Sequence, residues 1–316
     1  MQPMKFGKGQ AVRRSEDARF IRGAGHYATD YQPEGRAFAF FVRSPHAHAT
    51  FSIRNIDDVR AMKGVLAAWS AEDVSDLGIV PCQALIANSD GSQVKQTDYA
   101  VLCRGEVRHI GDAVAFIVAR TQAQAKDAAE ALDIAYEALP VAVGIEAAMR
   151  PGAPLVWPNL GTNVAVDAHI GDKAKTDKAF DKADRIVTIR LVNNRLVANY
   201  MEPRVCTAEY DPAGKSYRLT LGSQGVHGLR DTLAKIMGVK ADRIRVVTPD
   251  VGGGFGNKSF MYREYPLLAK AARKLRRAVS WVQERGEHFL TCVHGRDNIV
   301  TAEMALSKSG KFLAMR

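Results

Sequence analysis

The chain has 316 residues and a formal net charge of +10, with 47% hydrophobic and 25% charged residues. This composition is ordinary for a soluble globular protein, and the length allows about two domains. No apolar run approaches the ~18–20 residues of a membrane span, and the N-terminal MQPMKFGKGQ lacks the apolar core of a secretory signal, so we expect a cytoplasmic chain.

The basic residues are scattered, which argues against a nucleic-acid patch. The densest cluster lies at the end of a predicted helix, where cations favour the helix dipole: Arg273, Lys274, Arg276 and Arg277. A solvated helix end is therefore the favoured interpretation. A basic surface also suits an acidic partner subunit or a route to a phosphorylated cofactor.

The four cysteines are spread along the chain: Cys82, Cys103, Cys206 and Cys292. They form no CxxC pair, and none has a histidine at metal-ligand spacing. We therefore expect reduced, mostly buried thiols and no metal ligands in this chain.

In chain order, the first part predicts an α+β domain. Residues 1–18 are polar and basic and predict an N-terminal arm. Strands are expected at 36–44, 51–56, 65–70, 106–119 (interrupted at Gly111) and 136–143. Two helices separate them: a short one capped by Asp57 and Asp58, and an Ala-rich one over 122–134 capped by Thr121. We assign 19–145 to this domain.

A segment rich in Pro and Gly, RPGAPLVWPNLGTN, follows at 150–163 and predicts a linker, which we place at 146–163.

The second part, 164–316, also mixes helices and strands. We expect helices over 176–183 and 225–238, a hairpin formed by 204–211 and 216–223, and further strands at 185–192, 243–248 and 278–284. A last hairpin turns at Ser309-Gly310, and its second strand runs to Arg316 without a closing turn. We expect this chain to belong to a longer polypeptide or to be completed by a partner.

The stretch from Val246 to Gly256, VVTPDVGGGFG, is the most informative one. Its four glycines let the backbone adopt positive φ and approach a ligand closely. A strand precedes the loop, and helical spacing of Leu267, Leu268, Ala271, Ala272 and Leu275 follows it. A strand, a glycine loop and a helix N-terminus together favour an anionic cofactor.

The glycines alone leave other interpretations open. A dinucleotide fold needs G-x-G-x-x-G, but the sixth position counted from Gly252 is Asn257, although Glu284 follows at the end of the next strand. A phosphate-binding P-loop is excluded because no G-x-x-x-x-G-K-[ST] occurs. A purely structural tight turn does not need three adjacent glycines.

The surrounding motifs carry a resemblance that covers nearly the whole chain from about Arg13. VGGGFGNK, LGSQGVHGLRDTLAKIMG and LLAKAARKLRRAVSWVQERGEHF resemble the molybdopterin-binding subunit of the xanthine dehydrogenase and aldehyde oxidase family. The GNK ending is similar to the carbon monoxide dehydrogenase large-subunit branch. SPHAHATFSIRNID and RHIGDAVAFIVARTQAQAKDAAEAL resemble the family's a/b hammerhead domain, and PGAPLVWPNLGTN its link to the molybdenum domain.

This resemblance implies an α+β chain with a hammerhead domain followed by the first, incomplete part of a molybdopterin-binding domain. It also implies a molybdenum enzyme that oxidises a small carbon substrate with water as the oxygen source. The molybdopterin would be held as the cytosine dinucleotide. Two 2Fe–2S clusters and FAD are expected on partner subunits, and a further polypeptide is expected to carry the remainder of the molybdenum domain.

By position, the resemblance assigns cofactor contacts to the loop residues Gly253, Gly254, Phe255 and Gly256, and to Gln224. General chemistry is compatible with these roles. Backbone N–H groups stabilise oxo and phosphate oxygens, and a glutamine amide donates without becoming charged. By itself, Gln224 is also typical of a polar helix cap and Phe255 of packing beneath a loop. His227 is assigned no role.

The sequence departs from the family pattern in two respects. Ser259 stands where some relatives have a substrate-facing Glu, which argues against the usual purine hydroxylation. The family's catalytic Glu belongs to a region beyond this chain, and nothing transfers its role to Glu264 or Glu284. The active-site cysteine loop of carbon monoxide dehydrogenase is absent too. We therefore expect the isolated chain to be inactive.

Three alternatives remain open from the sequence. A partner completes the site of a split subunit, or the chain is a truncated product. A non-catalytic scaffold relative keeps the fold without binding metal. A nicotinamide-dependent dehydrogenase uses the glycine loop for a dinucleotide.

Overall fold

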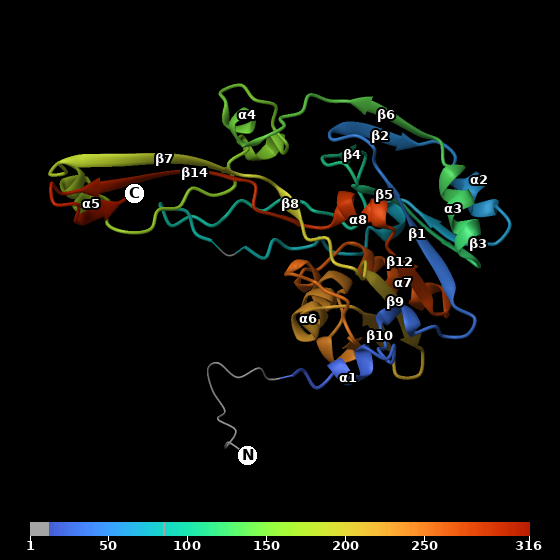
Figure 1. The fold of residues 1–316 in the computed structure, drawn as a ribbon. Helices are drawn as coiled ribbons and strands as arrows, with labels where there is room; N and C mark the ends of the chain where they lie inside the picture. The colour runs from blue at the N-terminus through green and yellow to red at the C-terminus, as the bar shows by residue number, and fades with distance from the viewer. Residues whose placement is uncertain (1–12, 85) are drawn as a thin grey trace, which may run out of the picture.

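A seven-stranded sheet forms the centre of the molecule in a computed structural model that describes residues 13–84 and 86–316 (Figure 1). The strand order is β11-β10-β9-β12-β1-β5-β3. The strands are β1 (Ala37–Arg43), β3 (Val65–Trp69), β5 (Ala113–Ala119), β9 (Val205–Asp211), β10 (Ser216–Leu221), β11 (Ile244–Val247) and β12 (Val279–Val282). Strand β5, AVAFIVA, lies between β1 and the edge strand β3 and is buried at every residue, as its unbroken apolar run indicates.

Both halves of the chain build this sheet. The junction is a parallel pairing of β1 with β12, in which Ala37 lies opposite Val279 and Phe38 opposite Ser280. The Ala37 amide also donates to the carbonyl of Ala278 at 2.8 Å. The expected α+β class is confirmed, but the two expected domains share one sheet. Their limits at 19–145 and 164–316, with the linker at 146–163, stay a prediction.

The first half adds a small second sheet with the order β4-β2-β6. It contains β2 (Ala49–Ile53), β4 (Glu106–Val107) and β6 (Ile134–Ala138). The strand-like segment expected over 106–119, with its interruption at Gly111, is divided into β4 and β5, which belong to different sheets. Gly111 lies at the break with φ +93°, and a Cβ there would lie 2.8 Å from the Leu290 carbonyl oxygen.

The helices of the first half are α1 (Asp17–Phe20), α2 (Ile56–Ala61) and α3 (Gln122–Glu130), with α4 (Ile145–Met149) beyond β6. Thr121 caps α3 as expected, since its side chain accepts from the Gln124 amide at 3.2 Å. The expected capping of α2 by Asp57 and Asp58 is wrong, because the helix begins at Ile56 and both aspartates lie in its first turn. Residues 1–12 of the expected arm lie outside the described residues.

The second half covers the sheet with α6 (Val226–Met237) and α7 (Glu264–Leu275), while α8 (Arg285–Thr291) follows β12. The helix expected over 225–238 is confirmed as α6, which buries Leu229, Leu233 and Ile236 on one face. The expected hairpin is also confirmed, because β9 and β10 pair antiparallel, with Cys206 opposite Leu221 at one end and Asp211 opposite Ser216 at the other.

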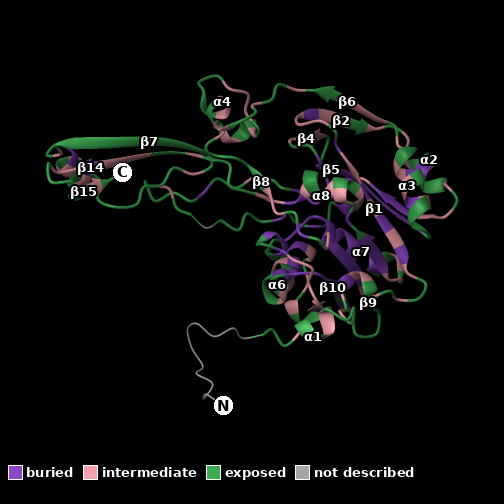
Figure 2. Cartoon of the chain, viewed as in Figure 1, coloured by how far each residue is buried: buried purple, intermediate pink, exposed green. Residues whose placement is uncertain are grey.

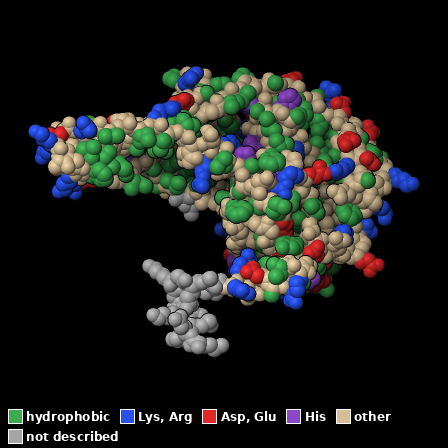
Figure 3. Space-filling view, viewed as in Figure 1, with side chains coloured by type: hydrophobic (Ala, Val, Ile, Leu, Met, Phe, Trp, Pro, Cys, Tyr) green, Lys and Arg blue, Asp and Glu red, His purple; other side chains and the backbone are tan. Residues whose placement is uncertain are grey.

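A long arm extends from the body of the molecule (Figure 1). It consists of β7 (Arg185–Asn193), β14 (Asn298–Leu306) and β15 (Phe312–Met315), with α5 (Lys173–Phe180) packed against β15. The two short strands β8 (Leu196–Val197) and β13 (His294–Gly295) pair at its base. All nine residues of β7 are exposed, and Figures 2 and 3 show the arm as an exposed segment with many apolar side chains.

No helix in residues 13–84 and 86–316 is long and apolar enough to cross a membrane.

Candidate cofactor-binding site

The glycine loop follows β11 and leads into a 3-10 turn at Asn257–Ser259. Gly253 and Gly256 both have φ +93°, and Phe255 has φ +46°, which is uncommon for a residue with a side chain. Helix α7 begins only at Glu264. The expected helix N-terminus next to the loop is therefore wrong, because the 3-10 turn and four further residues separate them.

Three of the loop glycines lie against the protein's own chain. A Cβ at Gly252 would lie 2.5 Å from the Glu202 Cβ, and one at Gly253 would lie 2.9 Å from the Tyr200 Cβ. A Cβ at Gly254 would lie 2.5 Å from Gln224 Oε1. Internal packing thus requires glycine at these three positions, whereas Gly256 faces open space and needs glycine for its backbone angle.

Gln224 joins the loop, as expected, but through its oxygen atom. Gln224 Oε1 accepts from the Gly256 amide at 2.9 Å and from the Lys258 amide at 3.3 Å. Within the described residues, the Gln224 Nε2 group donates to no protein acceptor. Because the side chain is exposed, this amide is available to a ligand.

The amides in the middle of the loop are free as well. Gly252 donates to Glu202 and Asn257 donates to the Gly254 carbonyl, but Gly253, Gly254 and Phe255 find no acceptor in the part of the chain that the structure describes. Three consecutive unpaired N–H groups and one side-chain amide form a donor set of the kind that binds oxo or phosphate oxygens. These residues therefore fit an anionic cofactor.

The Phe255 side chain projects from the loop into solvent, with 77% of the residue's surface exposed. The interpretation of Phe255 as packing beneath the loop is wrong, since the ring faces solvent. The five residues Gln224, Gly253, Gly254, Phe255 and Gly256 thus meet in one place, and their role as cofactor contacts stays a prediction.

The sequence did not indicate the buried ion pair next to the loop. Lys258 Nζ lies 2.6 Å from Glu202 Oε2, and the two side chains are 0% and 9% exposed. Burial lowers the pKa of Lys258, although Glu202 opposes this effect. The sequence offered one signal for this ion pair, the position of Lys258 just after the loop. Its partner Glu202 lies 56 residues earlier in the chain and could not be paired with it from the sequence.

The N-terminal segment is tied to the start of the loop. Arg19 pairs with Asp250, and the His26 amide donates to Asp250 Oδ2 at 2.8 Å. The Arg19 hydrogen bond and the His26 amide hold the pKa of Asp250 at about 2. Asp250 therefore serves as an anchor for residues 19–26 and not as a proton acceptor at neutral pH.

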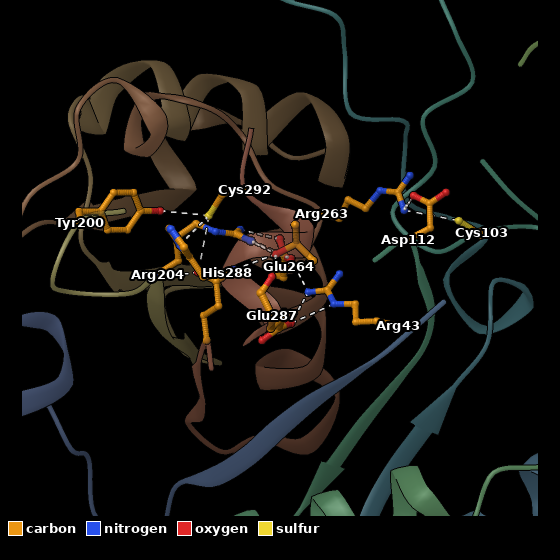
Figure 4. A network of polar contacts seen from close by, with 12 residues as sticks. Arg43, Cys103, Asp112, Tyr200, Arg204, Arg263, Glu264, Glu287, His288 and Cys292 are labelled. Carbon is orange, nitrogen blue, oxygen red and sulfur yellow. Dashed lines mark hydrogen bonds and ion pairs between the residues drawn. The ribbon is translucent and has the colours of Figure 1, made fainter. Parts of the chain in front are cut away.

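A buried network of charges joins residues from distant parts of the chain (Figure 4). Glu264 lies 3.0 Å from Arg204 and 2.6 Å from Arg43, and Arg43 also contacts Glu287 at 2.6 Å. Burial alone would raise the pKa of Glu264, but Arg204 and Arg43 outweigh it and hold the pKa at about 2. Glu264 is thus an ion-pair partner and is unsuited to be a general base.

A second cluster in Figure 4 contains Tyr200, His288 and Cys292. Cys292 Sγ lies 3.2 Å from the Tyr200 hydroxyl and 3.1 Å from His288 Nδ1. Burial and the nearby Arg285 and Arg204 lower the pKa of His288 to about 4, so its ring is neutral at pH 7. Cys292, Cys103 and Cys206 are buried free thiols and Cys82 is an exposed one, which agrees with the expectation.

A cavity of about 580 Å³ lies between the first half of the chain and the segment Thr291–His294. Cys103, Arg263 and Trp157 also line it, but none of the predicted site residues does. The cavity lies close to the loop because Asn257 Nδ2 donates to the Val293 carbonyl at 2.9 Å. Among residues 13–84 and 86–316, no group of three His, Cys, Asp or Glu side chains is placed to hold a metal ion.

Comparison with known proteins identifies both parts of the chain. Residues 22–140 match the a/b hammerhead domain of aldehyde oxidase and xanthine dehydrogenase, and residues 156–316 match the molybdopterin cofactor-binding domain. The carbon monoxide dehydrogenase large chain of Afipia carboxidovorans is 34% identical, with 98% of this chain and 39% of the relative covered. The nicotine 6-hydroxylase large subunit of Paenarthrobacter nicotinovorans is 30% identical, with 98% and 37% covered.

Solved structures agree with these matches. Quinoline 2-oxidoreductase from Pseudomonas putida 86 superposes with a TM-score of 0.88 at 31% identity, covering 97% of this chain and 38% of that one. Carbon monoxide dehydrogenase from Oligotropha carboxidovorans gives 0.85 at 34% identity, covering 98% and 39%. The chain thus spans less than two-fifths of the length of these relatives. It belongs to the aldehyde oxidase and xanthine dehydrogenase family of molybdopterin-dependent oxidoreductases, with that family's hammerhead domain followed by its molybdopterin-binding domain.

Proposed function

We propose that this chain holds the molybdopterin cofactor in a molybdenum hydroxylase that oxidises a small carbon substrate with water as the oxygen source. The observation that carries this proposal is the donor set of the glycine loop. The unpaired amides of Gly253, Gly254 and Phe255 lie beside Gln224, whose oxygen is bound to the loop and whose Nε2 group is free within the described residues.

Each loop residue has a distinct part in this proposal. The three amides bind anionic oxygens of the cofactor without bringing a mobile charge to the site. Gln224 Nε2 adds a neutral donor, while Gln224 Oε1 keeps the Gly256 end of the loop in place. The exposed ring of Phe255 would help to exclude water from a cofactor held at the loop. The cofactor, when bound, supplies the exchange of electron pairs with the substrate at its molybdenum ion.

Neither Glu264 nor Glu284 is suited to act as a general base. Glu264 is held ionised by two arginines, and Glu284 is half exposed and paired with Lys126. We therefore expect the catalytic Glu on polypeptide outside this chain, and no hydroxylase activity from the chain alone. Turnover by the isolated chain with stoichiometric molybdenum would contradict this expectation.

The finer features of the enzyme are part of the same proposal. We propose a cofactor in the cytosine dinucleotide form, and 2Fe–2S clusters and FAD on partner subunits. Two relatives are a large chain and a large subunit, and the 6-hydroxypseudooxynicotine dehydrogenase relative is a subunit of a complex, which supports such partners. The cytoplasmic location stays a prediction.

The substrate is not carried over from any one relative. The relatives are named for carbon monoxide, nicotine and quinoline, which differ widely in size and shape. Ser259, which is exposed after the loop, offers no carboxylate, so we do not expect the usual purine hydroxylation. The residues that select the substrate are expected outside this chain.

Metal analysis of the assembled complex tests the proposal. We would co-produce the chain with the remainder of the molybdenum domain and with the iron–sulfur and FAD subunits, and measure molybdenum and released cytosine nucleotide. We expect stoichiometric molybdenum, and a strong loss of it in Gly254→Ala, because the new Cβ would lie 2.5 Å from Gln224 Oε1.

Gly286→Ala is the matched control for this experiment, since a Cβ at Gly286 meets no atom within 4 Å. It should retain the molybdenum content of the wild type. An intact complex without molybdenum would contradict the proposal and would favour the non-catalytic scaffold.

The nicotinamide alternative loses its structural basis. A dinucleotide unit needs two adjacent parallel strands joined across the glycine loop. Here β11 precedes the loop and β12 follows α7, but β10 and β9 lie between them in the sheet. We therefore expect no quenching of NADH fluorescence on titration with the chain.

A further inference from the structure

One buried carboxylate contacts both ends of the glycine loop. Glu202 Oε2 accepts from the Gly252 amide at 2.9 Å and from Lys258 Nζ at 2.6 Å. Gly252 opens the loop, and Lys258 follows its last glycine by two residues. The Glu202 amide also donates to the Gly252 carbonyl at 3.1 Å, so Gly252 is bound to Glu202 through both of its backbone groups.

The protein makes room for this ion pair. A Cβ at Gly222 would lie 3.0 Å from Glu202 Oε2 and 3.3 Å from Lys258 Nζ, so a larger residue would press on both partners. The Lys258 ammonium lies 4.7 Å from the centre of the Tyr200 ring, which offers it a cation–π contact. Burying two charges costs solvation energy, which the attraction between them often does not outweigh. A contribution to stability is therefore a weak explanation for this buried pair.

Lys258 is also where the second anchor of the loop is attached. Its amide and that of Gly256 both donate to Gln224 Oε1, and its carbonyl accepts from the Gln224 amide at 3.1 Å. The backbone of Lys258 is thus bound to Gln224 while its side chain is bound to Glu202. A change in the ion pair is transmitted to the Gly256 end of the loop through this one residue.

We propose that Glu202 and Lys258 are positioning residues, whose ion pair sets the separation of the two loop ends and so keeps the amides of Gly253, Gly254 and Phe255 in their unpaired arrangement. A loop with four glycines among its five residues has many conformations available, and its own turn does not select one. The inference rests on the proposed cofactor-holding role of the loop, because the ion pair is argued to keep the cofactor-binding amides in place.

Amide hydrogen exchange of the free 316-residue chain tests this inference, with the probe amides at Gly252 and Gly256. If the pair couples the two ends, both amides open together in the wild type, with equal free energies of opening. Lys258→Met should reduce protection at both amides by about tenfold or more, and Glu202→Gln should do the same. The Gly256 amide is decisive, because its acceptor is Gln224 and not Glu202.

The control is Lys270→Met, which removes a lysine in the middle of α7 that pairs with the exposed Asp76 and takes no part in the Glu202–Lys258 ion pair. It should leave both amides unchanged. A pair that adds only global stability would lower protection equally in β5 and in the loop. A pair that acts only locally would leave Gly256 protected in Glu202→Gln. Either result would overturn the inference.

If Lys258→Met does not fold, the wild-type measurement still decides, because clearly unequal opening free energies at Gly252 and Gly256 exclude coupled ends. These outcomes are separate from those of the proposed function. If the two amides of the free chain open unequally while the complex contains stoichiometric molybdenum, only the positioning role is refuted. If the two amides open together while the complex lacks molybdenum, only the cofactor role is refuted.

Discussion

At the scale of single residues, the buried ring of His288 makes the stability of the protein depend on pH. The residue is 0% exposed, and its ring lies edge-on to Tyr200 with 4.7 Å between the ring centres. Burial lowers its pKa to about 4, whereas an unfolded histidine titrates near ~6.5. Between these values the unfolded chain binds a proton that the native chain does not. Stability is therefore lost as the pH falls below about 6.5.

We expect the free energy of unfolding to fall by about 2 kcal/mol from pH 7 to pH 5 on account of His288. Urea unfolding at the two pH values measures it. His288→Gln removes the titrating group from both states, so the difference should shrink by this amount even if the variant is less stable overall. His169→Gln, which replaces an exposed histidine, is made in parallel as the control for the loss of a histidine. An unchanged slope in His288→Gln would refute the assignment.

At the scale of elements, the network of Arg43, Arg204, Glu264 and Glu287 joins β1, the start of β9, α7 and α8. Arg204 is 0% exposed and lies 3.6 Å from the centre of the Tyr262 ring. Removing the charge of Glu264 leaves Arg204 buried without a full counter-charge. Such uncompensated charges are costly in a protein interior.

We therefore expect Glu264→Gln to lower the free energy of unfolding by about 3–5 kcal/mol, measured by urea unfolding at pH 7. Glu303→Gln is the matched control, because Glu303 forms an ion pair with Arg316 on the exposed arm. Surface pairs contribute only about 0–1 kcal/mol, so this variant should unfold close to the wild type. Equal effects of the two substitutions would show that the buried network has no special weight.

At the scale of the whole molecule, the shared sheet predicts that the two halves unfold together. A row of aromatic rings crosses the junction: Trp281 contacts Phe41 at 5.3 Å, Phe41 contacts Phe116 at 4.9 Å, and Phe116 contacts Trp69 at 5.4 Å. Trp69 belongs to the first half and Trp281 to the second. Opening either half would expose the apolar rings of the other, so neither half is stable by itself.

Fluorescence of the double variants Trp69→Phe/Trp157→Phe and Trp281→Phe/Trp157→Phe measures this coupling, because each retains only the tryptophan of the opposite half. We expect each variant to show one urea transition whose midpoint coincides with its circular dichroism midpoint. The matched control is Trp157→Phe, which removes a tryptophan outside the row and keeps both reporters. Two separate transitions in that variant would show that the halves unfold independently.

Much of the local structure was predictable from the sequence. Thr121 before an Ala-rich run predicted α3, and the two strand-like segments 204–211 and 216–223 predicted the β9–β10 hairpin, because caps, turns and apolar spacing act between near neighbours. Four glycines in five residues marked the loop. The limit of such reasoning appears at Gly111, where one apolar stretch is divided between two sheets by a close approach to Leu290 from a remote part of the chain.

The sequence by itself determined the position of the glycine loop, the α+β class and the neighbouring helices, since these depend on residue types at short spacing. Only the tertiary structure decided that β1 joins β12, that Glu202 meets Lys258, and that Arg43 reaches Glu264, 221 residues away. No local pattern encodes such pairs, because the charges and strand edges acquire their partners only when distant segments pack together.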